Sequence, residues 1–142
     1  MNYPRLLMAA VAAWAAYILV GMVMHEVMLD EVWEALYREG TVRSEAMART
    51  VAPTSYGLAL IGSLVFAYIY AKGYEGTPPL QEGMRYGVLV GLLVVGFGIA
   101  WAYSMFPVPT DFLIWMSVAE MIEFTVMGMV AGLVYGPAPT RR

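Results

Sequence analysis

Two glutamates, Glu120 and Glu123, lie near the centre of a long apolar stretch in the last quarter of the sequence. Their separation of three residues places both carboxyl groups on one face of a helix. An ionised carboxylate at the centre of a membrane costs at least about 2.5–3.5 kcal/mol. We therefore expect both side chains to face the interior of a helical bundle.

A histidine and a third glutamate, His25 and Glu26, lie in the outer half of the first apolar segment. They are adjacent, so on a helix they point about 100° apart, and only one can face the bundle centre squarely. His25 is the only histidine in the chain. The geometry allows a polar cluster of His25 and Glu120, joined by Glu26 or Glu123.

This polar cluster has three interpretations. The first is structural: protonated carboxyl groups would hydrogen-bond to nearby hydroxyls and hold the helices together, the candidate partners being Tyr17, Ser63, Tyr103 and Ser117. The second is proton or ion handling, since an intramembrane ionisable group is by default a functional-site hypothesis. The third is a metal site with His25 and Glu120 as ligands, because carboxylates with a histidine suit iron, manganese or zinc.

Motifs for enzyme chemistry are missing from the sequence. It contains no Gly-x-Ser-x-Gly, no phosphate-binding glycine loop and no His-Glu-x-x-His. A di-metal site in a bundle would take Glu-x-x-His from each of two helices, whereas this chain offers Glu-x-x-Glu and one histidine. The sequence thus favours a non-enzymatic protein, and it requires no cofactor.

The composition indicates that these residues lie in a lipid environment rather than in water. Of the 142 residues, 61% are hydrophobic and 13% are charged, whereas soluble domains carry about 25% charged residues. The net charge of −3 comes without a basic cluster, so nucleic acid has no binding surface on this chain. The absence of cysteine excludes disulfides, iron–sulfur clusters and thiolate metal sites. The partner that the composition predicts is the lipid bilayer.

Four apolar segments are long enough to cross the hydrocarbon core, which takes about 20 residues of helix. They are residues 6–29, 52–72, 84–106 and 111–136. We predict an all-α, single transmembrane domain over residues 1–142, arranged as an up-down four-helix bundle. Similar endings of the second and fourth segments raise the hypothesis of two related helical hairpins.

The long connection between the first two spans, residues 30–50, has an amphipathic pattern. Val32, Trp33, Leu36 and Tyr37 recur at helical spacing, opposite charged residues. This pattern suits a short helix lying on the outer face of the membrane. The alternative is that the first helix continues beyond the lipid.

The distribution of Lys and Arg predicts the orientation of the chain. One side of the membrane would hold the N-terminus and five basic residues, Arg5, Lys72, Arg85, Arg141 and Arg142. The other side would hold three, Arg38, Arg43 and Arg49. Because basic residues are enriched in cytoplasmic loops, we expect both termini in the cytoplasm.

Glycines recur every four residues in the last two spans, as Gly83, Gly87 and Gly91 in the third and Gly128, Gly132 and Gly136 in the fourth. Such spacing forms a smooth strip that lets another backbone approach closely. We expect this neighbour to belong to the same chain, with a second subunit as the alternative.

Tight helices without a soluble domain favour a non-enzymatic bundle, acting as a homo-oligomer or as an accessory subunit of a membrane complex. A proton- or ion-coupled transporter and a metal-binding protein are the alternatives.

The connection between the second and third spans has a recognisable sequence. Tyr-Ala-Lys-Gly-Tyr-Glu-Gly at residues 70–76, followed by Glu-Gly-Met-Arg-Tyr-Gly at residues 82–87, resembles the hairpin of small uncharacterised bacterial four-span membrane proteins. The resemblance extends to the histidine in the first span and to the glutamate with Gly-x-x-x-Gly in the last. It implies the bacterial inner membrane and no particular activity. Four residues of the hairpin are expected to form ion pairs at the cytoplasmic surface: Lys72, Glu75, Glu82 and Arg85.

Overall fold

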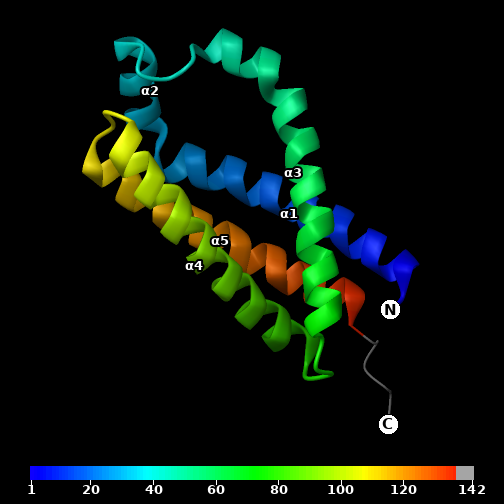
Figure 1. The fold of residues 1–142 in the computed structure, drawn as a ribbon. Coiled ribbons are helices and arrows are strands. Elements are labelled where there is room, and N and C mark those ends of the chain that lie inside the picture. Colours follow the sequence, from blue (N-terminus) through cyan, green and yellow to red (C-terminus); the bar gives the residue numbers. More distant parts are fainter. Residues whose placement is uncertain (137–142) are drawn as a thin grey trace.

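The computed structural model of the protein describes residues 1–136, and this part of the chain is all-helical (Figure 1). Its five helices are α1 (Tyr3–Met28), α2 (Asp30–Glu39), α3 (Glu45–Gly73), α4 (Pro79–Met105) and α5 (Thr110–Tyr135). Four of them, α1, α3, α4 and α5, are long and apolar enough to cross a membrane. The predicted all-α membrane fold is confirmed. Each long helix begins before the span predicted for it, because polar residues at its start continue the helix.

The helices α4 and α5 lie against each other along their glycine rows. A β-carbon on Gly83 would lie 2.2 Å from the backbone oxygen of Gly128, and a β-carbon on Gly87 would lie 2.3 Å from the backbone oxygen of Phe124. These distances are far below van der Waals contact, so only glycine lets the two backbones approach this closely.

The remaining glycines of the two rows also face atoms of the other helix. A β-carbon on Gly132 would lie 2.2 Å from the backbone oxygen of Pro79, and one on Gly136 would lie 2.6 Å from the Cγ atom of the same proline. Gly91, at the other end of the α4 row, faces the sulfur of Met121. The neighbour of each row is thus the facing helix of the same chain.

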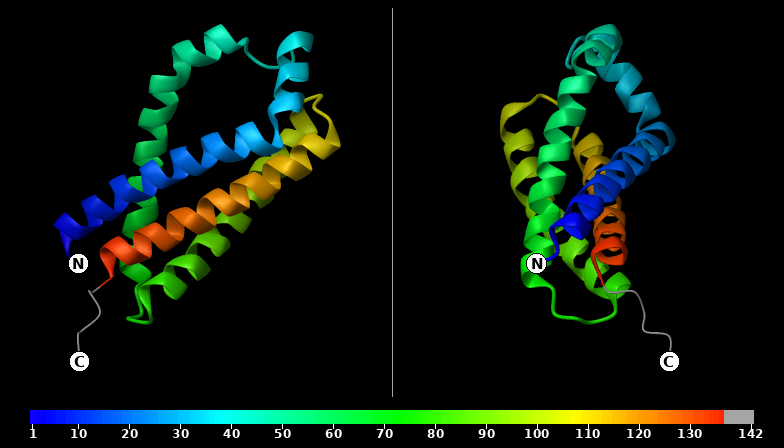
Figure 2. Two further views of the ribbon diagram at one scale, coloured as in Figure 1. Left: turned by 180° about the vertical axis from the view of Figure 1, so that it is seen from behind. Right: turned by 90° about the vertical axis from the view of Figure 1, so that its right-hand side faces the viewer.

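The helix α3 crosses α1 at a steep angle instead of running beside α4 (Figures 1 and 2). Its buried residues all lie in its second half: Ser63, Phe66, Ala67 and Tyr70. The indole Nε1 of Trp14 donates a hydrogen bond to the backbone oxygen of Tyr56 at 2.9 Å, which ties α3 to α1. The first half of α3 is therefore held to the bundle by few contacts.

The amphipathic segment forms a helix of its own, α2. The first helix is interrupted at Leu29, which has φ −127° and ψ 0°. At its other end, α2 is capped by Gly40 in the left-handed conformation with φ 71°. Leu29 and Leu36 are buried against Phe112 and Leu113 of α5. A single continuous first helix is thereby excluded, and α2 packs over the start of α5.

The short connection between α3 and α4 is organised by Glu82, which is 9% exposed. Its carboxylate accepts hydrogen bonds from the backbone N–H of Glu75 (2.6 Å), from the backbone N–H of Thr77 (3.0 Å) and from the Thr77 hydroxyl (2.7 Å). The predicted ion pairs among Lys72, Glu75, Glu82 and Arg85 are wrong, since residues 70–87 contain no ion pair. The tight loop turns its N–H groups inward, so these groups need the Glu82 carboxylate as an acceptor. The exposed cations Lys72 and Arg85 do not depend on it.

The start of α1, the α3–α4 connection and the end of α5 lie at the same end of the molecule (Figure 2). The guanidinium of Arg5 donates a hydrogen bond to the backbone oxygen of Gly136 at 3.3 Å and so joins the start of α1 to the end of α5. The predicted orientation, with both termini in the cytoplasm, requires these three segments to lie on the same side of the membrane. Arg141 and Arg142, on which that orientation also rests, lie outside the described residues.

Candidate functional site

A buried carboxyl group lies at the interface of α1 and α5. It belongs to Glu123, which is only 2% exposed. The carboxyl group packs against Gly21 of α1, where a β-carbon would lie 3.3 Å from the carboxyl carbon and from Oε2. A larger residue at position 21 would press on the carboxyl group, so Gly21 provides the room for it.

Next to this carboxyl group lies the ring of His25, which Trp33 of α2 holds in place. The indole Nε1 of Trp33 donates to Nδ1 of His25 at 3.0 Å, and the two rings stack with their centroids 5.7 Å apart. An indole N–H can only donate, so Nδ1 of His25 is the acceptor and carries no proton. The proton of the neutral imidazole is then on Nε2, the nitrogen that faces Glu123.

The two groups face each other without closing a hydrogen bond. Nε2 of His25 and Oε1 of Glu123 are 3.9 Å apart, which is beyond hydrogen-bonding distance. Within residues 1–136, Oε1 of Glu123 is buried and has no hydrogen-bond partner. The pair therefore places one N–H donor and one oxygen acceptor side by side, and neither is hydrogen-bonded within the described residues.

A pocket of about 410 Å³ opens beside this pair, between α1 and the first half of α3. Besides His25, Glu123 and Gly21, its lining includes Tyr17 of α1 and Ser55 of α3. The weak attachment of the first half of α3 leaves this space open. The site thus combines a buried acid and a neutral imidazole with a pocket beside them.

The second glutamate of the predicted pair lines a different pocket. Glu120 borders a space of about 580 Å³ between α4 and α5, which Trp33 and Arg43 also line. Three residues along a helix correspond to a rotation of about 60°, which is enough to turn the two carboxyl groups toward different pockets.

Several predicted members of the cluster lie elsewhere. Glu26 is exposed on α1, and Tyr103 is exposed on α4. The Ser63 hydroxyl donates to the backbone oxygen of Ala59, and the Ser117 hydroxyl donates to that of Leu113. These two serines therefore bond within their own helices and do not reach the glutamates.

Two residues of the site were not singled out from the sequence as members of it. Gly21 lies one helical turn before His25, a spacing that places both on the same face of α1. Trp33 belongs to a different helix, and its contact with His25 depends on the break at Leu29. The first could have been found from the spacing, whereas nothing in the sequence fixes the angle of that break.

The ligand set for a metal is incomplete. In the described part of the chain, no three His, Cys, Asp or Glu side chains lie close enough together to hold a metal ion. His25 pairs with Glu123, while Glu120 faces the other pocket. The geometry therefore gives no support to a metal centre built on His25 and Glu120.

We expect the single histidine of the protein to exist as the Nε2–H tautomer at neutral pH. Selective ¹⁵N-histidine labelling reports on this residue alone, and its Nδ1 resonance should be that of an unprotonated, hydrogen-bonded nitrogen. Trp33→Phe keeps an aromatic ring but removes the donor, so the tautomer ratio should shift by about two- to tenfold toward Nδ1–H. Trp115→Phe, an exposed tryptophan of α5, serves as the control. A protonated Nδ1 in the unaltered protein would show that this hydrogen bond is absent.

The site can do two things chemically. It can exchange a proton between a buried carboxyl group and an imidazole, and it can bind a small group that both accepts from Nε2–H and donates to Oε1. The relation to small bacterial four-span membrane proteins stays a prediction, since the chain matches no protein-family model, no curated protein and no solved structure.

Proposed function

We propose that this multi-pass membrane protein is a proton- or ion-coupled carrier whose exchange site is formed by Glu123 and His25. The observation that supports this proposal is the carboxyl oxygen of Glu123. This oxygen is buried at the helix interface and faces the imidazole across 3.9 Å, yet it accepts no hydrogen bond from any residue of the described chain. Glu123 is also one of the residues that line the pocket beside His25.

A purely structural glutamate would look different. Buried polar groups in folded proteins are almost always hydrogen-bonded, and leaving one unsatisfied costs about 1–3 kcal/mol. Glu82 shows the structural arrangement in the same chain, with three hydrogen bonds to its carboxylate. A site that must bind and release a proton or a substrate keeps its acceptor available, and this supports a functional role for Glu123.

The function that the sequence favours, a homo-oligomer or an accessory subunit of a membrane complex, is based on the glycine rows and on the lack of a soluble domain. These rows are occupied by each other within one chain and leave no smooth strip for another subunit. Assembly with other proteins therefore stays a prediction without support from this feature. We propose further that the carrier has both termini in the cytoplasm, which the distribution of basic residues supports. The resemblance of the hairpin at residues 70–87 supports the inner membrane of a bacterium as its location.

Proton flux into liposomes tests the proposed function. The purified protein is reconstituted with a pH-sensitive dye inside the vesicles, and a potassium gradient with valinomycin sets the membrane potential. We expect potential-driven acidification well above that of empty liposomes, and we expect Glu123→Gln, which cannot exchange a proton, to reduce it to the level of empty liposomes.

Glu26→Gln is the matched control for this experiment. It makes the same chemical change in a glutamate that lies beside His25 in the sequence but is exposed and does not line the pocket. Its flux should equal that of the unaltered protein. If the unaltered protein conducts no protons, or if Glu123→Gln conducts as well as Glu26→Gln, the proposed function is wrong.

A further inference from the structure

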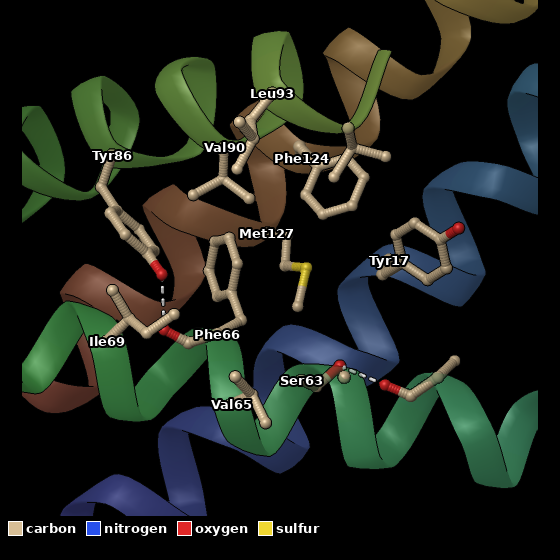
Figure 3. A pocket seen from close by; sticks show the side chains of 13 residues that line it. Tyr17, Ser63, Val65, Phe66, Ile69, Tyr86, Val90, Leu93, Phe124 and Met127 are labelled. Carbon is tan, nitrogen blue, oxygen red and sulfur yellow. Dashed lines mark hydrogen bonds between the residues drawn. The ribbon is translucent and has the colours of Figure 1, made fainter. Parts of the chain in front are cut away.

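The pocket between α3, α4 and α5 (Figure 3) has a volume of about 340 Å³ and an apolar lining, which includes Phe66, Val90 and Met127. The hydroxyls of Tyr86 and Ser63 in its wall are already used, since Tyr86 donates to the backbone oxygen of Phe66 at 2.7 Å and Ser63 bonds within α3. Among the described residues, no charged side chain lines this pocket. Its wall therefore gives no reason to prefer one ligand over the acyl chains of the surrounding lipid.

The pocket at Glu120, of about 580 Å³, differs because a carboxyl group belongs to its lining. The helices α4 and α5 touch along their glycine rows, where Gly83 and Gly87 meet the facing backbone. Farther along α4, Gly98 lines the pocket, and a β-carbon there would meet no atom within 4 Å. The two helices therefore leave space between their other halves, and residues 41–43 of the loop after α2 border this space.

The carboxyl group of Glu120 has no partner within residues 1–136. It forms no ion pair there, and the nearby hydroxyls of α5, those of Ser117 and Thr125, donate to backbone oxygens instead. Glu120 is partly exposed, and its oxygens are not among the fully buried, unpartnered atoms, whereas Oε1 of Glu123 is. A ligand in the pocket can therefore reach this carboxyl group.

This unpaired carboxyl group selects a cation. An ionised carboxylate inside the membrane is costly on its own, and a positive charge beside it offsets the cost because Coulomb attraction is strong where water is excluded. The remaining wall is mostly apolar and holds two edge-to-face ring pairs, Trp101 with Phe106 and Trp33 with Phe112. Aromatic rings pack against hydrophobic ligands and attract cations through their faces. The lining thus suits a hydrophobic organic cation.

The far end of the pocket carries a positive charge of the protein. The lining extends along α5 from Glu120 to Phe112, which are about 12 Å apart along the helix axis. Val42 packs on the cluster that contains Phe112, so the next residue, Arg43, borders the pocket near this end. A ligand with a second positive charge at its far end would meet the guanidinium, whereas an uncharged apolar tail would not.

We propose that the pocket between α4 and α5 binds a hydrophobic organic monocation, with its charged group at Glu120 and its apolar body extending toward Phe112. This proposal deepens the carrier function, on which it rests, by naming the class of cargo. Glu120 and Glu123 lie about one helical turn apart, so a cation at the first and a proton at the second repel each other, as exchange of one for the other requires. The volume is in the range of pockets for small organic ligands, about 300–1,000 Å³.

Equilibrium binding to the full-length protein in phosphatidylcholine nanodiscs tests the proposal. The probe is tritiated octyltrimethylammonium, which carries one permanent charge, and empty nanodiscs give the background. We expect saturable binding of one molecule per chain. Unlabelled probe should compete with it, whereas 2,2-dimethyldecane, which has carbon in place of the nitrogen, and the dication octane-1,8-bis(trimethylammonium) should each compete about tenfold less well or worse.

Variants of the two charged residues test the two ends of the site. Glu120→Gln should weaken binding of the probe by about tenfold or more, to the level of the uncharged hydrocarbon. Glu26→Gln makes the same change in an exposed glutamate outside the pocket and should bind the probe like the unaltered protein. Arg43→Gln should reduce the discrimination against the dication.

Two glycines of α4 provide matched variants for the space itself. A β-carbon on Gly98, which lines the pocket, or on Gly96, which does not, would meet no atom within 4 Å. Gly98→Phe should fill the pocket and abolish binding of the probe, while Gly96→Phe should bind it like the unaltered protein. Circular dichroism of both variants checks that the helices are retained.

The outcomes separate this inference from the carrier function. Binding no greater than to empty nanodiscs, equal competition by the hydrocarbon, or undiminished binding by Glu120→Gln would overturn the proposal. Proton flux that depends on Glu123, together with no saturable binding of the probe, would overturn the cation site alone. Saturable binding that depends on Glu120, without any proton flux, would overturn the carrier function and leave the cation site standing.

Discussion

Gly83→Leu is expected to separate α4 from α5 and to lower the free energy of unfolding by about 3 kcal/mol or more. A β-carbon at this position would already lie 2.2 Å from the backbone oxygen of Gly128. The obstructing atom is backbone, so no side-chain rotation can relieve the clash, and the helices must move apart. Gly83→Ala should show the same effect in weaker form. Thermal unfolding in detergent, followed by circular dichroism, measures the loss.

Gly96→Ala is the control for this prediction. Gly96 lies in the same helix, but a β-carbon there would meet nothing within 4 Å. Replacing a helical glycine by alanine gains about 0.5–1 kcal/mol where there is space. The two variants in α4 should therefore change stability in opposite directions. Equal stability of Gly83→Leu and the unaltered protein would mean that the backbones do not touch as described.

The glycine rows also show which parts of the fold the sequence predicts well. Spacing of four residues, as at Gly128 and Gly132, is a local property of one helix and defines a face without any knowledge of the partner. The four membrane spans follow from hydropathy for the same reason, because each helix satisfies its own backbone in lipid. Both predictions use only information that lies within one helix.

The candidate site combines a predictable part with an unpredictable one. That His25 and a glutamate of the last span would come together follows from the cost of exposing polar groups to lipid. Which glutamate faces the histidine depends on a rotation of about 60° around α5. The packing of the glycine rows sets this rotation, and it directs Glu123 to α1 and Glu120 to the other pocket.

Two further features depend on contacts between distant segments and leave no pattern in the sequence. The hydrogen bond from Trp33 to His25 requires the bend at Leu29, which is fixed by packing against Phe112. The ion pairs expected among Lys72, Glu75, Glu82 and Arg85 would stabilise an exposed surface by only about 0–1 kcal/mol each. Hydrogen bonds from N–H groups of the loop to a carboxylate contribute more, so the loop folds around Glu82 instead.

The two buried glutamates of the protein are expected to respond in opposite ways to replacement by leucine. Glu123→Leu removes an acceptor that has no partner in residues 1–136, so it should raise the free energy of unfolding by about 1–3 kcal/mol. Leucine is similar in size and fills the space beside Gly21. Glu82→Leu removes an acceptor that serves three donors, and the stranded donors should lower stability by about 2 kcal/mol or more.

Thermal unfolding of both variants in the same detergent, combined with the proton-flux assay, decides the role of Glu123. A more stable Glu123→Leu protein without flux would mean that the native chain gives up stability to keep a carboxyl group available at this interface, as an exchange site requires. A loss of stability as large as that of Glu82→Leu would contradict this. It would mean that Glu123 holds α1 and α5 together through a hydrogen bond, and the argument for a carrier would lose its basis.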